Sequence, residues 1–419
     1  MKAVILAGGK GERLAEISGG VPKPMMPLCG KPALLRQTEV LKCEGISDFI
    51  IVVGYKADKI KEYFGSGSDF GVNVTYFEED EPLGTGGALP LLGINDDILL
   101  CSGDLLFDFS LERMAAFHKE KNALVTLFAH PSSHPGDSTA IVTDPDGRVK
   151  GFAPKESREL HRNLSNAGIQ ILSREFISSI KGEGKLDLDR DIISPAVGKG
   201  GVYAYRCTEY VHDIGTPERF ARAENDIKLG IPEMRSLRNK QKAVFLDRDG
   251  TINVYKGYIS KPEDIELIPG AAEAINIIHD KGYLAVLITN QAVIARGECT
   301  FEELNEIHAR LEELLGEKGA YLDAVYFCPH HPDSGFPGER PEYKIKCSCR
   351  KPSPGMILSA VKDLNIDLDT SVMAGDAMCD VQTAKNAGCK SALLACGKQE
   401  KEKEGVADYP DLISFAKSL

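Results

Sequence analysis

The chain has 419 residues, 42% of them hydrophobic, and a formal net charge of −12. This length predicts two or three domains, and the negative charge argues against nucleic-acid or membrane-surface binding. Ala3–Ala7 is too short for a signal peptide, and no stretch approaches the ~18 apolar residues of a transmembrane helix. Eleven cysteines, an odd number, are typical of a reducing compartment, so we expect a cytoplasmic protein.

Short apolar runs alternate with amphipathic stretches up to about residue 230. The expected strands are Ala3–Leu6, Phe49–Val53, Val74–Phe77, Ile98–Cys101 and Leu124–Phe128. The expected helices are Pro32–Gly45, Ala57–Tyr63, Leu111–Lys121 and Pro217–Leu229. This alternation predicts an α/β domain over residues 1–230 with a doubly wound, mainly parallel sheet. The polar, proline-broken segment 231–241 is the expected linker.

The first expected strand runs into a glycine-rich loop that ends in Arg13. Its glycines let the backbone approach a phosphate closely, and the arginine can meet phosphate oxygens as a planar fork. A tight structural turn would explain such a loop about as often. Lys23 adds weight, because prolines on both sides stiffen the backbone around it. The two motifs together indicate a site for a phosphorylated ligand.

At this point the chain resembles the sugar-1-phosphate nucleotidylyltransferases, which open with G-G-x-G-x-R-L followed by K-P-M. Four further segments match in order: Glu81–Ala88, Ser102–Asp104, Asn166–Ile169 and Asp213–Pro217. The resemblance implies a nucleotide-binding set of Leu6, Ala7, Gly8, Gly9, Gly11, Gly84, Thr85, Gly86 and Gly87. It also implies that Asn166 and Gly168 contact the sugar.

The implied reaction joins two anions, because a sugar phosphate attacks the α-phosphorus of a nucleoside triphosphate and pyrophosphate leaves. Catalysis is then mostly alignment and charge neutralisation. Arg13 and Lys23 are the expected catalytic cations, and Asp104 and Asp213 the expected Mg²⁺ ligands. Lys155, Asp189, Arg190 and Asp191 are weaker candidates for contacts with the sugar phosphate.

A second alternation begins at residue 242. The expected strands are Ala243–Leu246, Leu284–Thr289, Ala324–Phe327, Ser371–Ala374 and Ser391–Leu394. The expected helices are Ala271–Lys281, Phe301–Leu315, Gly355–Leu364 and Asp380–Ala387, with a closing helix in Asp408–Leu419. This pattern predicts a second doubly wound α/β domain over residues 242–419.

Phe245–Thr251 contains the signature D-x-D-G-T and resembles the haloacid-dehalogenase superfamily. Asp247 would end a strand and attack phosphorus, and Asp249 would serve as general acid and base. The resemblance implies that Thr289 and Asn290 bind the phosphoryl group and that Lys351 neutralises charge. The implied Mg²⁺ ligands are Asp247, Asp249 and Asp376, with Asp380 as a further candidate.

Three cysteines and a histidine form a C-x-H…C-x-C pattern: Cys328, His330, Cys347 and Cys349. Thiolates and imidazole at this spacing suit a tetrahedral zinc site, and four protein ligands indicate a structural one. The loop between the two pairs is rich in glycine, proline and charge and has little apolar content, so we expect a bound metal to hold it in place. His331 is a rival ligand, and the family resemblance favours His330.

The zinc loop and its flanking motifs narrow the second resemblance to the D,D-heptose 1,7-bisphosphate phosphatases, with histidinol-phosphate phosphatase domains as nearest relatives. Arg350 would then contact the distal phosphate of a bisphosphate. Three residues depart from the family pattern: Ala292 and Val293 replace Ser-Gly, and Ala377 replaces a common lysine. We expect these departures to affect rate or anomer preference and to leave the chemistry in place.

A phosphatase that yields a sugar 1-phosphate is a natural partner for an enzyme that consumes one. The first half most resembles D-glycero-α-D-manno-heptose 1-phosphate guanylyltransferases, which implies heptose 1,7-bisphosphate, heptose 1-phosphate and GTP as substrates. One alternative is a hexose-1-phosphate nucleotidylyltransferase joined to a histidinol-phosphate-type phosphatase. Another is a catalytically dead sensor or scaffold, which the retained charged residues disfavour. The sequence leaves the oligomeric state open, and a homo-oligomer is compatible with it.

Overall fold

The computed structural model describes residues 1–132, 139–154, 160–182, 184–335, 337–395 and 407–419, apart from the side chains of residues 12, 15 and 16. Contacts divide the chain into two units. The first comprises residues 1–130, 141–152 and 166–236, and the second 131–140, 153–165 and 237–419. The sequence predicts a contiguous first domain, whereas two short segments belong to the second unit. Within that unit Arg162 donates to both carboxylate oxygens of Glu312, at 2.7 and 2.8 Å.

The expected linker, residues 231–241, contains regular structure. Helix α8 (Ile231–Met234) opens it and belongs to the first unit. The boundary between the units falls after Ser236. Gln241 then pairs with the second unit, since its N–H donates to Asn365 O at 3.0 Å and its carbonyl accepts from Asp367 N at 2.7 Å. The chain therefore enters its second sheet directly from a hydrogen-bonded segment.

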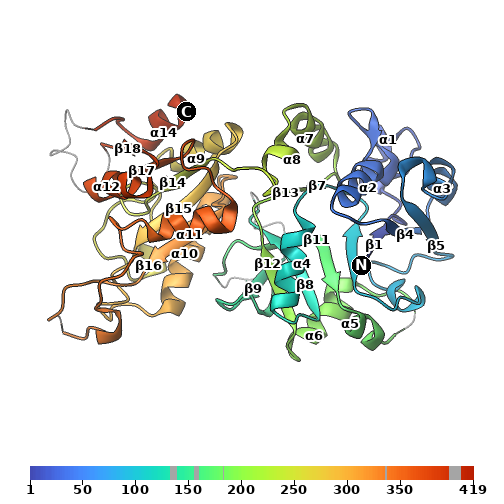
Figure 1. Cartoon of the computed structure of the whole chain (residues 1–419), viewed down its shortest axis with the longest axis horizontal. Coiled ribbons are helices and arrows are strands. Elements are labelled where there is room, and N and C mark those ends of the chain that lie inside the picture. Colours follow the sequence, from blue (N-terminus) through green and yellow to red (C-terminus); the bar gives the residue numbers. More distant parts are fainter. Residues whose placement is uncertain (133–138, 155–159, 183, 336, 396–406) are drawn as a thin grey trace. The chain divides into compact units, whose positions relative to one another are not determined.

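The first unit is built on a nine-stranded sheet (Figure 1). Its main path runs β10 (Val149–Ala153), β9 (Ala140–Thr143), β11 (Ser165–Leu172), β6 (Ile98–Ser102), β1 (Lys2–Leu6), β4 (Asp48–Val53) and β5 (Asn73–Glu78). Strand β8 (Val125–His130) joins β11 to β12 (Val202–Arg206). The neighbours β6, β1, β4 and β5 are parallel, as are β8 and β12, whereas β11 runs antiparallel to β6 and β9. The mainly parallel α/β sheet is confirmed.

Helices connect the strands of the first unit. They are α1 (Ala15–Ser18), α2 (Ala33–Cys43), α3 (Ala57–Phe64), α4 (Leu111–Glu120), α5 (Arg174–Ser179), α6 (Ser194–Val197) and α7 (Pro217–Lys228), with a π-helical turn, η6, over Leu188–Ile193. Side chains cap the starts of α4, α5 and α7: Ser110 accepts from Arg113 N, Ser173 from Phe176 N, and Thr216 from Arg219 N. Two small antiparallel sheets pair β2 (Pro27–Leu28) with β3 (Lys31–Pro32) and β7 (Leu105–Asp108) with β13 (Tyr210–Asp213). The second pairing sets Asp213, the last residue of β13, opposite Leu105, the first residue of β7, so Asp104 and Asp213 lie at the same end of this small sheet.

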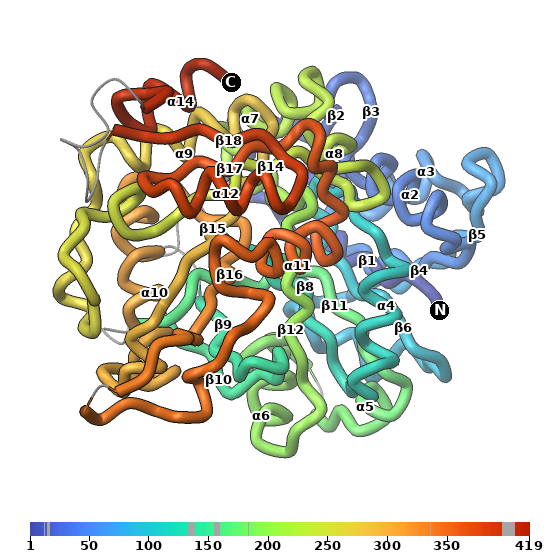
Figure 2. The backbone as a smooth tube through the Cα atoms, turned by 60° about the vertical axis from the view of Figure 1, so that its left-hand side comes forward, coloured from blue at the N-terminus to red at the C-terminus, as the bar shows by residue number. Residues whose placement is uncertain are grey.

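The second unit has a five-stranded sheet in which every neighbouring pair is parallel. Its order is β16 (Ala324–Cys328), β15 (Leu284–Asn290), β14 (Ala243–Leu246), β17 (Val372–Gly375) and β18 (Lys390–Leu393). The helices are α9 (Ala271–Asp280), α10 (Phe301–Gly316), α11 (Gly355–Leu364), α12 (Met378–Ala387) and α14 (Leu412–Ser418). Figure 2 shows α14 beside α9, where Phe415 joins the core around Ile275. Because β14 is central and fully buried, the residues after it emerge at the carboxyl edge of the sheet.

Two sequence expectations concern the whole chain. Among the described residues, no helix is both long and apolar enough to cross a membrane. The ten cysteines in the described part of the chain form no disulfide.

Candidate active sites

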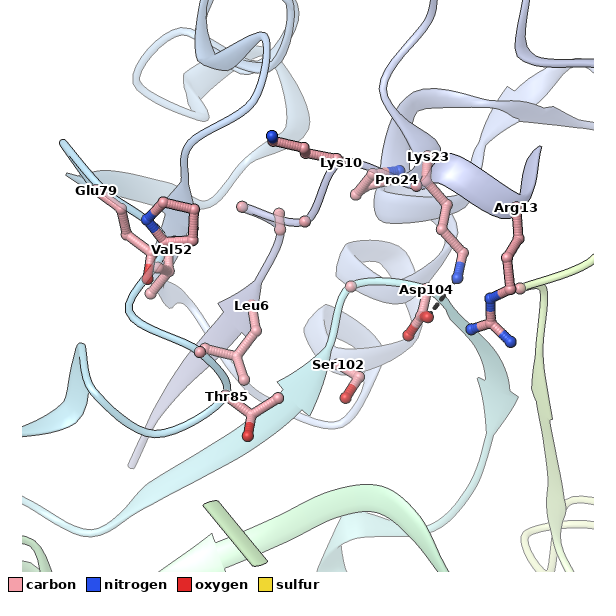
Figure 3. A pocket seen from close by; sticks show the side chains of 18 residues that line it. Leu6, Lys10, Arg13, Lys23, Pro24, Val52, Glu79, Thr85, Ser102 and Asp104 are labelled. Atoms are coloured by element: carbon pink, nitrogen blue, oxygen red, sulfur yellow. Dashed lines mark hydrogen bonds and ion pairs between the residues drawn. The ribbon is translucent and has the colours of Figure 1, made fainter. Parts of the chain in front are cut away.

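A cavity of about 560 Å³ opens where β1 and β6 end in the first unit (Figure 3). Ten residues of the expected site line it: Leu6, Ala7, Gly8, Gly9, Gly11, Arg13, Lys23, Gly84, Thr85 and Asp104. Val52 and Glu79 also line the cavity, although they lie outside the motifs that match the family. The remaining lining residues lie within those motifs but were given no individual role: Lys10, Pro24, Pro82, Ser102, Gly103 and Gly215. A glycine-rich wall with three basic side chains suits an anionic, phosphate-bearing ligand.

The expected catalytic cations meet an acidic residue at one end of this cavity. Lys23 Nζ lies 2.5 Å from Asp104 Oδ2, and the Arg13 guanidinium lies beside this pair (Figure 3). Gly215 makes room for them, because a Cβ there would be 3.2 Å from Arg13 Nη2 and from Lys23 Nζ, and 2.9 Å from Asp213 Oδ1. The structure therefore brings Arg13, Lys23, Asp104 and Asp213 together around one glycine.

Asp213 lies just behind the cavity lining and has a cationic partner of its own. Arg219 Nη1 donates to both of its carboxylate oxygens at 2.9 Å. Burial alone would raise the pKa of Asp213, but the bonds and charge of Arg219 hold it below its ordinary value. The carboxylate is therefore ionised and available to a cation at neutral pH.

Glu79 faces the opposite end of the cavity from Lys23 (Figure 3). One carboxylate oxygen accepts a hydrogen bond from Leu83 N at 3.3 Å. The other lies against the glycine-rich loop, so that a Cβ on Gly8 would come within 2.5 Å of it. Burial raises the pKa of Glu79 above its ordinary value, and the bond from Leu83 opposes that rise. The cavity thus has a cationic end and an acidic end.

Gly86 and Gly87 belong to the expected nucleotide-binding loop but do not line the cavity. A Cβ on Gly86 would meet the Ile192 side chain at 2.4 Å, and one on Gly87 would meet the carbonyl of Gly184 at 2.2 Å. Both glycines therefore let the loop pack against η6 and the segment that leads into it. Gly86 N also donates to Leu186 O at 2.9 Å, which fixes this packing.

Asn166 and Gly168, the expected sugar contacts, also lie outside the cavity lining. Asn166 Nδ2 donates to Asp189 Oδ1 at 3.1 Å, and its Oδ1 accepts from Gly168 N at 3.1 Å. Arg190 forms an ion pair with Asp191 at 2.7 Å. Lys155 lies outside the described residues. Strand β11 and η6 thus form one polar group of side chains beside the main cavity.

In the second unit Lys351 lies between two carboxylates. Its Nζ is 2.7 Å from Asp247 Oδ1 and 2.6 Å from Asp380 Oδ1, and only 2% of its side chain is exposed. Burial raises the pKa of Asp247 to about 7, with nearby carboxylates adding to the rise and the ammonium opposing it. The same two carboxylates raise the pKa of Lys351 against the effect of burial. Lys351 is therefore a permanent cation beside the candidate nucleophile.

Three carboxylates of the second unit form a cluster that could hold a metal ion. Asp247, Asp376 and Asp380 each offer an oxygen within 4.8 Å of the others. Gly250 has a φ of +86°, and a Cβ there would lie 2.5 Å from Asp376 Oδ2, so the D-x-D-G turn needs glycine. Oxygen ligands suit Mg²⁺.

Asp249 was expected in this magnesium set, but the structure directs its carboxylate elsewhere. It accepts from Arg248 Nε at 3.1 and 3.2 Å, from Asn253 Nδ2 at 3.1 Å and from Gln291 Nε2 at 3.1 Å. Asp380, the further candidate, occupies the third place in the cluster. The reason is the neighbouring donors, which satisfy both oxygens of Asp249.

The two residues expected to bind a phosphoryl group end β15. Thr289 is buried, and its Oγ1 accepts from Gln291 Nε2 at 2.8 Å. The Asn290 side chain brackets the backbone of Lys351: its Nδ2 donates to Lys351 O at 3.1 Å and its Oδ1 accepts from Lys351 N at 3.0 Å. Asn290 therefore helps to fix the position of the lysine.

The three cysteines and the histidine of the expected zinc site converge. Cys349 Sγ lies 3.2 Å from Cys328 Sγ, 3.3 Å from Cys347 Sγ and 3.3 Å from His330 Nδ1. These lengths approach the edges, about 3.8 Å, of a tetrahedron with zinc–sulfur bonds of about 2.3 Å. His331 lies outside the cluster and accepts from Asp333 N. Four converging soft ligands fit a closed structural metal site.

Arg350 adjoins this cluster. Its Nη1 donates to the carbonyl of His330 at 3.0 Å, and its N–H donates to Cys347 Sγ at 3.4 Å. Ala292 and Val293, two of the departures from the family pattern, are buried. The third, Ala377, donates its N–H to Asp380 Oδ2 at 3.1 Å at the start of α12.

Folds and sites together define two phosphate-handling α/β enzymes in one chain. The Nucleotidyl transferase family model matches residues 2–229, and a HAD-hydrolase-like model matches residues 348–418. The first match covers more than half of the chain, which therefore belongs to the nucleotidyl transferase family. The chain is bifunctional, with a nucleotidyltransferase domain followed by a phosphatase domain of the haloacid-dehalogenase type.

Individual relatives show which phosphatase family the second domain belongs to. It is 40% identical over 188 residues to a D-glycero-beta-D-manno-heptose-1,7-bisphosphate 7-phosphatase of Pasteurella multocida, covering 42% of this chain and 100% of that protein. This domain belongs to that phosphatase family. A solved D,D-heptose 1.7-bisphosphate phosphatase from B. bronchiseptica, complexed with magnesium and phosphate, is 32% identical with a TM-score of 0.37, over 42% of this chain and 97% of that one.

A solved structure is also similar to the first domain. HddC from Yersinia pseudotuberculosis, complexed with GMP-PN, is 28% identical with a TM-score of 0.45. The similarity covers 54% of this chain and 99% of that chain.

Proposed function

We propose that the second domain hydrolyses the 7-phosphate of D-glycero-D-manno-heptose 1,7-bisphosphate. The observation that carries the proposal is the 40% identity to a whole phosphatase named for that reaction. The buried Asp247–Lys351–Asp380 arrangement supports it, because it places a carboxylate beside a fixed cation and a candidate metal cluster. Arg350, at the edge of the zinc loop, is the proposed contact for the distal phosphate.

The proposed chemistry assigns one role to each residue. Asp247 attacks phosphorus, and Asp249 exchanges protons with the leaving group and with water. Lys351 neutralises the negative charge of Asp247 and of the phosphoryl group. Thr289 and Asn290 bind phosphoryl oxygens. A bound Mg²⁺ would be held by Asp247, Asp376 and Asp380 and would neutralise phosphate charge.

We propose that the first domain transfers GMP from GTP to the resulting heptose 1-phosphate, giving GDP-heptose and pyrophosphate. Arg13 and Lys23 line the cavity and would screen the phosphates, so that two anions can meet. Asp104 and Asp213 would hold Mg²⁺, which supplies further charge neutralisation when bound. No general base is needed, since the sugar phosphate is already nucleophilic. Asn166 and Gly168 would contact the sugar.

Glu79 supports guanine as the base. A carboxylate only accepts hydrogen bonds, and guanine presents two donors side by side, N1–H and the N2 amino group. Adenine, uracil, thymine and cytosine offer no such pair on their Watson–Crick edges. The acidic end of the cavity therefore fits guanine, with Arg13 and Lys23 at the other end for the phosphates.

The Cys328, His330, Cys347 and Cys349 cluster would hold a structural Zn²⁺. Four protein ligands leave no open position for substrate, so the metal would staple the loop that carries Arg350.

Two assays on the full chain test the proposed substrates. Phosphate release from the α and β anomers of heptose 1,7-bisphosphate tests the phosphatase. Pyrophosphate release from GTP, ATP, UTP, CTP and dTTP, each with heptose 1-phosphate and with mannose 1-phosphate, tests the transferase. We expect one anomer, GTP and the heptose to be preferred. Preference for mannose 1-phosphate or for another nucleotide would reject this assignment of the first domain.

A further inference from the structure

Arg248 is a fully buried arginine set between the two aspartates of the D-x-D motif. The residue is 0% exposed, and its side chain is the largest of the fully buried ones in the described part of the chain. Its Nε and Nη2 both point at the carboxylate of Asp249, with contacts of 3.0 to 3.2 Å. Its remaining nitrogen, Nη1, has no hydrogen-bond partner among the described residues.

Burying the Arg248 guanidinium carries a free-energy cost. A buried guanidinium keeps its charge and loses its hydration, and here one carboxylate is its only ion-pair partner in the described structure. Apolar side chains in place of both Arg248 and Asp249 would fill the same space at similar or lower cost. Packing alone therefore does not explain why an arginine occupies this position.

Two more buried residues complete the arrangement. Asn253 Nδ2 donates to Asp249 Oδ1 at 3.1 Å, and Gln291 Nε2 donates to Oδ2 at 3.1 Å. Both residues are buried, at 0% and 2% exposure. With Arg248 they supply donors to both oxygens from three directions, so the carboxylate cannot rotate freely.

We propose that Arg248, assisted by Asn253 and Gln291, is a positioning residue that aims the Asp249 carboxyl group at the leaving-group oxygen. This inference rests on the proposed phosphatase activity and on the role of Asp249 in it. Arg248 itself touches neither phosphate nor sugar, and it acts only through Asp249.

The step it serves is a proton transfer within phosphoryl transfer. An oxygen of Asp247 bonds to phosphorus, the bond from phosphorus to the sugar oxygen breaks, and that oxygen takes the Asp249 proton. Water then attacks the aspartyl phosphate, returns a proton to Asp249, and releases phosphate and free Asp247. The donors of Arg248, Asn253 and Gln291 stabilise the carboxylate that remains between these steps.

The test compares two leaving groups that differ in their need for a proton. An alkoxide needs a proton as it departs, whereas p-nitrophenolate leaves readily without one. kcat/KM reports steps up to aspartyl-phosphate formation, which is the step that Asp249 assists as an acid. We therefore compare kcat/KM of the full chain for heptose 1,7-bisphosphate and for p-nitrophenyl phosphate, in the wild type and in Arg248→Lys. The lysine keeps the charge but cannot direct three hydrogen bonds at two oxygens.

We expect Arg248→Lys to lose about 10²-fold or more with the heptose substrate and only a few-fold with p-nitrophenyl phosphate. Asp249→Asn should show the same selective loss, and Gln291→Met a smaller one. Arg310→Lys, at a partly exposed arginine on α10, is the matched control and should change neither value. If Arg248→Lys fails to fold, the Gln291→Met comparison decides.

Three outcomes overturn the inference. Equal losses for both substrates in Arg248→Lys or Gln291→Met would mean that these residues only support the fold. A selective loss in Asp249→Asn but full activity in both variants would reject the positioning role and keep the proposed function. An Asp249→Asn enzyme without leaving-group selectivity would reject the proposed role of Asp249, and the inference with it.

Discussion

The ammonium of Lys351 lies 2.7 Å from Asp247 Oδ1, and both side chains are largely buried. The same ammonium contacts Asp380, so it separates two carboxylates that would otherwise repel each other. Removing this cation should therefore affect stability as well as chemistry.

Lys351→Met should abolish phosphate release and lower the free energy of unfolding by about 3–5 kcal/mol, because two buried carboxylates lose their counter-charge. Urea unfolding and phosphate release on the full chain measure the two effects. Lys351→Arg should retain more of the stability than of the activity. A Met variant with wild-type turnover would show that the lysine is dispensable.

The two sites should be separable by single substitutions. Asp247→Asn should lower phosphate release by about 10³-fold or more and leave nucleotidyl transfer intact, since it removes the proposed nucleophile. Asp104→Asn should do the reverse. Assays of both activities on each purified variant decide this, with circular dichroism to verify folding. Loss of both activities in one folded variant would contradict the assignment of two independent sites.

Glu79 should determine which nucleobase the first domain selects. Glu79→Gln replaces one acceptor by a donor that clashes with guanine N1–H or N2–H₂, so kcat/KM for GTP should fall by about 10²-fold or more. The loss should be smaller for ITP, which lacks the N2 amino group. Glu78→Gln is the matched control, because Glu78 is exposed and pairs with Lys61. An unchanged GTP preference in Glu79→Gln would show that the carboxylate only anchors Leu83.

Cys349 contacts all three of the other proposed zinc ligands. Cys349→Ser should reduce the zinc content measured by plasma mass spectrometry and lower Tm, because a closed structural site contributes folding energy directly. Cys43→Ser, at an exposed thiol, should change neither. A wild-type protein that purifies without metal and keeps its Tm in strong chelator would contradict the zinc assignment.

His308 on α10 should make the second unit sensitive to acid. Burial, together with the charges of Arg248 and Arg162, lowers the pKa of His308 well below its ordinary value. The unfolded chain binds this proton near pH 6.5 and the folded chain does not, so stability should fall as pH drops below that value. The expected slope is about 1.4 kcal/mol per pH unit from this residue. His308→Gln should remove that part of the slope in urea unfolding between pH 7 and 5, and an unchanged slope would show that His308 is protonated in the fold.

Local motifs predict much of both sites. Asp247, Lys351, Arg13, Lys23 and Asp104 lie where strand ends and loop chemistry place them, because parallel strands present their carboxyl ends at one edge. The convergence of Cys328, His330, Cys347 and Cys349 follows in the same way, since their spacing leaves few ways to bring three thiols and an imidazole together.

Side-chain destinations that depend on distant partners could not be predicted. The Asp249 carboxylate lies outside the group formed by Asp247, Asp376 and Asp380, because Gln291, 42 residues away, and Arg248 donate to its oxygens. Gly86 faces η6 and Gly87 faces the segment before it, and no local pattern reveals the approach of either. Glu79 lies at a strand end among other acids, and only the folded cavity distinguishes it.

We propose above that one chain performs two consecutive steps on one sugar. The most direct measurement is ³¹P NMR of the purified protein with Mg²⁺, GTP and heptose 1,7-bisphosphate, for each anomer separately. We expect inorganic phosphate, pyrophosphate and a GDP-sugar to appear together from one anomer. Phosphate from either anomer without any nucleotide sugar, or no turnover of either, would contradict the coupled assignment.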